Sequence, residues 1–165
     1  MPHPQPEPIS AGQESVWDYP RPPRVEHVDR RVRITLGGVL IVDTADVVRV
    51  LETSHPPVYY LPQDAFAPGA LASGPGGSVC EFKGSARYFD VQAGGELRPH
   101  AAWGYPDPLP GYEALRDRVA VYPAMMDRCT VDGVEVTPQP GRFYGGWITP
   151  EIRGPFKGGP GTLGW

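Results

Sequence analysis

Four short segments combine aromatic rings with proline or glycine and with groups that donate, accept or carry charge. They cover residues 54–62, 78–84, 101–108 and 142–147. An aromatic ring supplies a rigid apolar wall, and tyrosine or tryptophan adds a polar tip to that wall. Pockets for small organic molecules combine such walls with a few placed polar groups. We therefore expect these segments to meet around one shared pocket.

Aromatic residues are the expected walls of that pocket. The candidates for substrate binding are Tyr60, Tyr88, Trp103, Tyr144 and Trp147. Tyr59 and Tyr60 are neighbours in an extended segment, so one should enter the core and the other should face a pocket or the surface. The glycines between Tyr144 and Trp147 would allow this segment to fold over the pocket as a lid. Packing in the core or in an ordinary loop is the alternative for these rings.

Ionisable side chains beside these rings suit acid–base chemistry. His55 titrates near neutrality and precedes two prolines, which hold its backbone extended. Glu81 is a second candidate base, Tyr105 is a candidate acid, and Lys83 would stabilise a developing anion. The alternatives are a histidine that bonds its own loop and an exposed Glu81–Lys83 pair, which would contribute little to stability.

Cys80 offers a different chemistry, because a thiolate is a nucleophile and a redox group. In a regular strand Cys80 and Phe82 share one face, while Lys83 lies on the other. A bulge at Lys83-Gly84 would be needed to bring the thiol and the ammonium group together. The alternative is a buried structural thiol.

The two cysteines, Cys80 and Cys129, are far apart and belong to no C-x-x-C pair. We expect both to be free thiols, as in a reducing cytoplasm. A structural zinc site takes four ligands, which isolated cysteines and scattered histidines do not supply. The sequence therefore predicts neither a metal nor another cofactor.

Composition restricts the partners. The net charge is −4 and the sequence pI is about 5.5, so no general basic surface for nucleic acid is expected. The chain contains neither an apolar run of about 18 residues nor a signal segment, which predicts a soluble, cytoplasmic protein without membrane contact. A small-molecule ligand or substrate is the expected partner, and assembly into a homodimer stays open.

The fold class expected is mainly β. Glycine and proline are abundant, with 21 and 22 residues, yet four tryptophans and eight tyrosines stand among runs of valine, isoleucine and leucine. A turn-rich, single β domain explains both features. Strands are predicted at 28–36, 39–44, 47–51, 58–61, 79–82, 86–91, 101–105 and 119–122, and a hairpin is predicted from strands at 130–131 and 134–137.

The sequence also predicts how the domain is bounded. Residues 1–12 are rich in proline and poor in apolar mass, so they are expected to form a disordered tail. Residues 13–165 would form one domain with an irregular C-terminal arm. Residues 62–77 read as a loop, with one helical turn near 63–67. Residues 111–119 are predicted to form the one short helix, with Tyr112, Leu115 and Val119 on one face.

Longer motifs resemble the DUF427 family (domain of unknown function), in the form common in actinobacteria. The matching segments are 14–21, 50–62, 80–88, 101–106, 122–123, 143–149 and 154–158. The resemblance implies a β-tent, a folded-sheet or barrel-like architecture similar to methionine sulfoxide reductase B and to the thalidomide-binding domain of cereblon. Zinc cysteines that pin many such domains are missing here. Phe82 stands where the family often has tryptophan or tyrosine, and the family carries no settled activity.

Three functions fit these observations. The first is a small-molecule-binding domain, or a cofactor-free acid–base enzyme of isomerase, cyclase, lyase or hydrolase type. The second is a cysteine-dependent redox or acyl-transfer enzyme that works through Cys80. The third is an interaction module that docks a partner, or a second copy of itself, through the aromatic segment 142–165.

Overall fold

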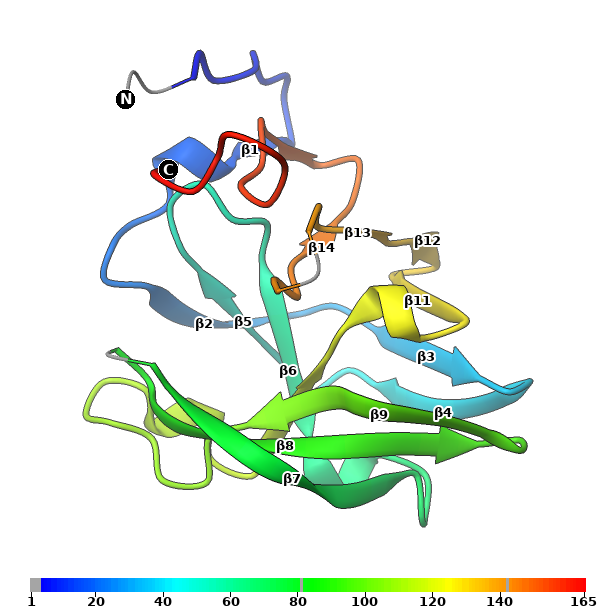
Figure 1. The fold of residues 1–165 in the computed structure, drawn as a ribbon. Coiled ribbons are helices and arrows are strands. Elements are labelled where there is room, and N and C mark those ends of the chain that lie inside the picture. Colours follow the sequence, from blue (N-terminus) through cyan, green and yellow to red (C-terminus); the bar gives the residue numbers. More distant parts are fainter. Residues whose placement is uncertain (1–3, 81, 142) are drawn as a thin grey trace.

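The computed structural model describes residues 4–80, 82–141 and 143–165 as a mainly β domain (Figure 1). The larger sheet has the strand order β2-β5-β6-β10-β9-β8-β7, and it is open at β2 and β7. Its strands are β2 (Arg24–Val28), β5 (Val47–Leu51), β6 (Val58–Pro62), β10 (Arg118–Val121), β9 (Glu96–Gly104), β8 (Gly84–Ala93) and β7 (Leu71–Cys80).

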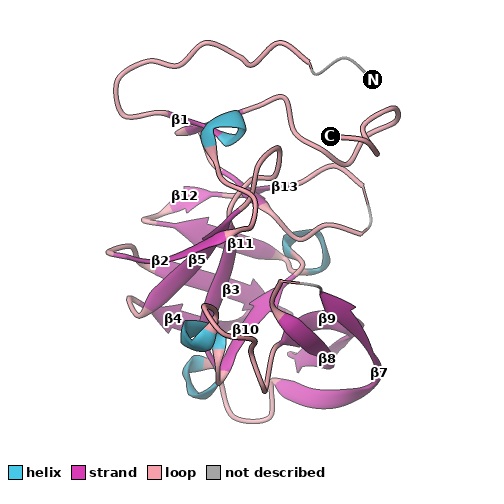
Figure 2. Cartoon of the chain, turned by 90° about the vertical axis from the view of Figure 1, so that its left-hand side faces the viewer, coloured by secondary structure: helices cyan, strands magenta, loops and turns pink. Residues whose placement is uncertain are grey.

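A smaller sheet packs on one face of the larger one. Its order is β12 (Val134–Glu135), β11 (Arg128–Val131), β3 (Val32–Leu36) and β4 (Val39–Thr44). Figure 2 shows β7, β8 and β9 gathered on one side of the molecule and β2, β3, β4 and β5 on the other. Within the described residues neither sheet closes on itself into a barrel, and the predicted small, mainly β, single-domain fold is confirmed.

The hairpin between β3 and β4 shows how the sequence builds this fold. Val32, Ile34 and Leu36 alternate with polar residues, and all three side chains are fully buried. Gly37 and Gly38 adopt φ angles of 60° and 76°, which a primed two-residue turn requires. The predicted hairpin is confirmed.

The predicted helix at 111–119 is wrong. In its place stand the 3-10 helix η3 (Glu113–Leu115) and the start of β10. Asp117 has a φ of 58°, a left-handed conformation that no continuous right-handed helix contains. Tyr112 and Leu115 join one apolar cluster, whereas Val119 joins another. The other helices in the described residues are also 3-10 turns: η1 (Val16–Asp18), η2 (Gln63–Ala65) and η4 (Pro123–Met125).

The loop expected between residues 62 and 77 is too long, because β7 already begins at Leu71. β7 contains several glycines and Pro75, a composition that is typical of loops. β7 lies at the edge of the sheet and pairs only with β8, with a register shift between Ser73 and Gly77. Proline and irregular pairing are tolerated at such an edge.

The larger sheet separates two apolar clusters. On β6, Tyr59 and Leu61 face the main core beneath the smaller sheet, while Tyr60 faces the opposite side. The same alternation sends Ala102 of β9 into the main core and Trp103 to the opposite side. The prediction that Tyr59 and Tyr60 part is confirmed, and the second face is where the pocket lies.

Both ends of the chain meet at the top of Figure 1. There β1 (Glu14–Ser15) pairs in parallel with β15 (Ile152–Arg153), while β13 (Thr137–Pro138) pairs with β14 (Trp147–Ile148). In the N-terminal segment, the Glu7 amide donates to the carbonyl of Gly154 over 2.9 Å. Disorder of residues 1–12 stays a prediction. Among the described residues, no helix has the length and apolarity needed to cross a membrane.

Candidate functional site

A pocket of about 400 Å³ lies on the second face of the larger sheet. It is lined by most of the residues that the sequence singled out: His55, Tyr60, Cys80, Lys83, Tyr88, Trp103, Tyr105 and Tyr144. They come from β6, β7, β8 and β9, from the turn after β7 and from three loops, which carry His55, Tyr105 and Tyr144. Residues from all four segments singled out in the sequence therefore line one cavity.

The floor of the pocket is a row of side chains across neighbouring strands. Trp103 on β9 stands opposite Tyr88 on β8 and opposite Ala120 on β10. The small Ala120 leaves the space that the indole fills. Tyr122 completes this wall, with its ring centroid 4.6 Å from that of Trp103. Cross-strand aromatic pairs stabilise sheets and form flat surfaces on which a ligand can stack.

Buried hydroxyls in this wall form a chain of hydrogen bonds. Trp103 Nε1 donates to the Tyr60 hydroxyl over 3.2 Å, and a side-chain hydrogen bond couples Tyr60 to Tyr105. Burial raises the pKa of Tyr60 and of Tyr105 well above the usual value of tyrosine. Both side chains therefore stay protonated at neutral pH. Tyr105 can accept from Tyr60 while its own proton remains available to a ligand.

Two lysines stand over this aromatic surface. Lys83 Nζ lies 5.8 Å from the ring centroid of Tyr105, and Lys157 Nζ lies 5.7 Å from that of Tyr144. Neither ammonium group pairs with an aspartate or glutamate side chain within the described part of the chain. Lys157 Nζ donates to the carbonyl of Trp165 over 3.3 Å. Both cations therefore keep hydrogen-bonding capacity for a ligand.

Lys157 was not among the residues predicted from the sequence, although the chain carries a signal for it. Lys83 and Lys157 are the only lysines, against thirteen arginines, and each stands in a Phe-Lys-Gly tripeptide. The strand-parity argument that separated Lys83 from Cys80 is also wrong. β7 ends at Cys80, so Lys83 lies in the turn before β8, and both residues line the pocket. The Leu109 amide holds this turn by donating to the Lys83 carbonyl over 3.0 Å.

His55 enters the pocket from the loop between β5 and β6. Its Nδ1 lies 2.9 Å from the carbonyl of Thr53, which can only accept a hydrogen bond, so Nδ1 carries a proton. Burial lowers the pKa of His55, and the carboxylate of Glu52 offsets part of that effect. The neutral ring then presents Nε2 as a free acceptor. His55 therefore bonds its own loop through Nδ1 and also lines the pocket, so the two alternatives expected for it hold together.

Ser54 holds this loop in an unusual conformation. Its φ is 71°, and its side chain is fully buried with no hydrogen-bond partner for the hydroxyl among the described residues. Left-handed backbone and an unpaired buried polar atom each cost free energy, and such costs concentrate at functional sites. The carbonyl of Ser54 accepts from the Lys157 amide over 2.9 Å. This bond places the histidine loop beside the second lysine.

Trp147 does not line the pocket, contrary to the prediction. Its side chain is fully buried in the main core, with its ring centroid 5.0 Å from that of Tyr59. Gly145, two residues earlier, packs directly on Trp103: a Cβ added there would lie 2.3 Å from the indole ring. The segment 143–146 therefore covers the pocket as expected, but it is anchored by Trp147. Glu81, the second candidate base, lies outside the described residues.

Gln139 fixes this covering segment, and sequence reasoning missed it. The side chain is buried, with Oε1 accepting from the Gly146 amide over 3.1 Å and Nε2 donating to the Lys157 carbonyl over 2.8 Å. The Gln139 side chain thus joins the segment 143–146, which covers the pocket, to the part of the C-terminal arm that carries Lys157. Other lining residues that were not predicted are Glu52, Val58, Ser78, Val79, Ala86, Tyr122 and Phe143.

The second cysteine is placed away from the pocket. Cys129 on β11 is buried in the main core, and burial raises its pKa to about 12. Cys80 lies across the larger sheet and is half-buried. Both are free thiols, as predicted. In the described residues no group of three or more histidine, cysteine, aspartate or glutamate side chains has the geometry of a metal site.

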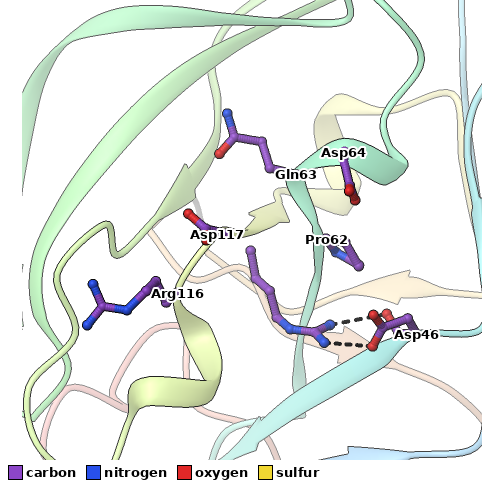
Figure 3. Close-up of a pocket in the computed structure, with 7 residues that line it drawn as sticks. Asp46, Pro62, Gln63, Asp64, Arg116 and Asp117 are labelled. Atoms are coloured by element: carbon purple, nitrogen blue, oxygen red, sulfur yellow. Dashed lines mark hydrogen bonds and ion pairs between the residues drawn. The ribbon is translucent and has the colours of Figure 1, made fainter.

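A larger depression of about 710 Å³ lies elsewhere on the surface (Figure 3). Its polar side chains do not converge: Figure 3 shows Asp46 and Arg116 on opposite sides, with Gln63 and Asp64 pointing apart. Arg118 is already paired with Asp46 over 2.6 Å. The smaller aromatic pocket is the better candidate site, because its two lysines pair with no aspartate or glutamate side chain in the part of the chain that the structure describes.

Sequence comparison agrees with the resemblance noted above. The family model described as "Domain of unknown function (DUF427)" matches residues 24–132, which is more than half of the chain. No curated protein matches the sequence. The matched region runs from β2 to the end of β11 and contains the strands that build the floor of the pocket, while Tyr144 and Lys157 lie beyond it. The chain therefore belongs to the DUF427 family.

Proposed function

We propose that the aromatic pocket binds a small, planar organic anion. The observation that carries this proposal is that both lysines of the chain stand over aromatic rings at one pocket and, within the described residues, pair with no aspartate or glutamate side chain. Two ammonium groups favour a carboxylate, phenolate or enolate.

The shape of the pocket supports a flat ligand. The rings of Trp103 and Tyr122 are in contact at an interplanar angle of 45°, and Gly145 lies against the indole, so the covering segment stays close to this wall. A pocket of about 400 Å³ is within the range that small organic ligands occupy. Flat rings gain contact area between such walls without losing much conformational freedom.

The charge of the pocket supports an anion. Glu52 also lines it, but its carboxylate accepts from Arg21 Nε over 3.2 Å. That contact offsets the negative charge, so Glu52 does not neutralise the lysines. The buried rings of Tyr60, Trp103 and Tyr105 lower the local polarity, which strengthens the attraction between an ammonium group and a bound anion.

The same residues would support proton transfer without a cofactor. His55 Nε2 is the candidate base, Tyr105 is the candidate donor, and Lys83 would stabilise an enolate or another oxyanion as it forms. Isomerisation, cyclisation, elimination and hydrolysis all use this set of groups. Free thiols at both cysteines fit a reducing compartment such as the cytoplasm.

The first test replaces each lysine in turn. Lys83→Met and Lys157→Met remove the charge and keep much of the apolar stem. We expect each to weaken the binding of 4-methoxybenzoate, a planar carboxylate, by about tenfold or more, because hydrogen bonds to charged groups contribute about 1.5–3 kcal/mol. Isothermal titration calorimetry measures the dissociation constants.

Arg128→Met is the matched control, because Arg128 is an exposed cation that does not line the pocket. It should bind as the wild type does. The proposal fails if the wild-type protein shows no saturable binding of planar carboxylates, or if the control loses as much affinity as the lysine variants.

Cysteine chemistry through Cys80 is the second candidate, because this half-buried thiol lies in the same pocket. Redox or acyl transfer would require Cys80→Ser to abolish activity on a substrate that still binds. Cys129 is too deeply buried in a different cluster to serve as its resolving thiol. Docking through the aromatic C-terminal segment stays the third proposal, and concentration-dependent mass in solution would favour it.

A further inference from the structure

A second cavity of about 420 Å³ adjoins the aromatic pocket. Tyr122, Gln139 and Tyr144 line both cavities and form their common wall. Another contact joins the two sites: the ring of Tyr88, in the first pocket, stacks on His100, in the second cavity, with centroids 4.1 Å apart. The two cavities are therefore neighbours with shared side chains.

The second cavity is more apolar than the first. It is formed mainly by proline, alanine and methionine side chains: Pro99, Pro123, Ala124, Met125 and Pro138. It contains neither lysine, and among its described lining residues His100 is the sole ionisable side chain apart from the shared tyrosines. Methionine adapts its shape to an aliphatic ligand, and prolines form rigid apolar walls. This composition suits a hydrocarbon group better than a second charged group.

The common wall has fixed and adjustable parts. Gln139 is buried and bonded at both ends of its amide, and Tyr122 is packed on Trp103. Tyr144 has only ring contacts: its centroid lies 5.3 Å from those of His55 and Phe143, and Lys157 lies over its face. Because a rotation of Tyr144 breaks no hydrogen bond to a described residue, this ring is the adjustable part of the common wall.

We propose that the two cavities hold one ligand, with a planar anionic head in the aromatic pocket and an apolar extension that passes Tyr144 into the proline-lined cavity. This inference rests on the proposed function and defines the ligand class more narrowly, as an amphiphilic aromatic or conjugated acid. Lys83 and Lys157 select the head, and the second cavity selects the length of the extension.

A series of 4-alkoxybenzoates with one to eight carbons in the alkoxy chain tests this inference. In the wild-type protein, affinity should rise by about fourfold for each methylene group that enters the second cavity, and should level off when the cavity is filled. Ala124→Trp fills that cavity from an exposed position, so it should remove the gain for long chains and leave 4-methoxybenzoate binding unchanged. Ala124→Asp should have the same effect through charge.

Ala45→Trp is the matched control, because Ala45 is equally exposed and lines neither cavity. It should keep the full dependence on chain length. If 4-methoxybenzoate binds but affinity is independent of chain length, or if Ala124→Trp and Ala124→Asp keep the wild-type dependence, the inference is overturned while the proposed function stands. If no member of the series binds the wild-type protein, both fall.

Discussion

His55 owes its place in the pocket to its own backbone. The Thr53 carbonyl occupies Nδ1, and Ser54 turns the chain through a left-handed conformation just before the ring. A histidine held in this way has one defined tautomer and one free nitrogen, which general base catalysis requires. The unpaired hydroxyl of Ser54 is a cost of the same turn.

The pH dependence of His55 gives a first prediction at this scale. Burial lowers its pKa below the usual 6.5, so the unfolded chain binds this proton more readily than the folded protein. The neutral His55 ring therefore makes its full contribution to the free energy of unfolding above pH 6.5. That free energy decreases as the pH falls from 6.5 through the pKa of His55 in the folded protein. NMR titration of the ring proton should give a midpoint below 6.5.

The variant His55→Gln should lose less free energy of unfolding than the wild type between pH 7.5 and 5.5, as measured by urea unfolding. Gln at this position cannot take up the proton, and the other histidines of the chain provide the common background. A His55 midpoint at or above 6.5 would show that the ring is not buried as described.

The position of a single residue could be predicted where it depended on alternation within one strand. Alternation alone placed Tyr59 and Tyr60 on opposite faces, although it gave no sign of which one faced the pocket. Gln139 and Lys157 lie 18 and 36 residues beyond the end of β10, the last strand of the pocket floor. Only the path of the C-terminal arm brings them there, and strand periodicity carries no information about such a path.

At the scale of elements, the pocket is an open sheet face with a cover. β6, β8 and β9 supply the rings, and the segment 143–146 lies over them, anchored by Trp147 in the core. The closeness of cover and floor depends on Gly145, where even a methyl group would overlap the ring of Trp103. Glycine at position 145 therefore allows the covering segment to lie directly on the indole ring of Trp103.

Gly145→Ala should lower the free energy of unfolding by about 2 kcal/mol, because overpacking of this kind forces the segment away from the indole. It should also weaken ligand binding. Urea unfolding and calorimetry measure the two effects. Gly159→Ala is the control in the same arm, since a Cβ there meets no atom within 4 Å, and it should change neither quantity. Equal effects in both variants would contradict this role of Gly145.

Elements with a strict period of two were predicted well, and irregular ones were not. The β3–β4 hairpin followed directly from alternation and a Gly-Gly turn. The segment 111–119 mimicked a helical period because Tyr112 and Leu115 are three residues apart, as a single 3-10 turn also places them. β7 was partly hidden because glycine and proline at a sheet edge resemble a loop.

At the scale of the whole molecule, both chain ends close over one edge of the larger sheet. Val16, Tyr19, Leu51 and Ile152 form a separate apolar cluster there. Beside it Arg49, with only 10% of its side chain exposed, binds Glu14 over 2.9 Å and Glu26 over 2.6 Å. This ion network fastens the N-terminal segment to β5 and thereby supports the arm that carries Lys157.

Arg49→Ala should lower the free energy of unfolding by about 2 kcal/mol, because it removes charged hydrogen bonds from two partly buried carboxylates. Burial would raise the pKa of Glu14, but hydrogen bonds from Arg49 and Tyr19 lower it below the usual 4.5. This stabilisation is complete above pH 4.5 and is lost as the pH falls through the folded pKa. The variant should therefore show a weaker loss of stability in acid.

Urea unfolding at pH 7 and pH 4 compares the two proteins. Arg33→Ala is the control, since Arg33 is about half exposed and its ion-pair partner among the described residues is Asp43 on the surface. It should cost about 0.5 kcal/mol or less. An Arg49→Ala protein as stable as this control would mean that the network does not hold the chain ends together.

The central claim, that both lysines bind one planar anion, is tested most directly by NMR of the lysines themselves. Reductive methylation with ¹³C-formaldehyde keeps their charge and labels just two side chains, because the chain contains no other lysine; the α-amino group gives a separate signal that both lysine variants retain. Lys83→Arg and Lys157→Arg assign the two signals. Titration with 4-methoxybenzoate should shift both signals along saturation curves with the same dissociation constant. Signals that stay in place, or that move without saturating, would contradict the account.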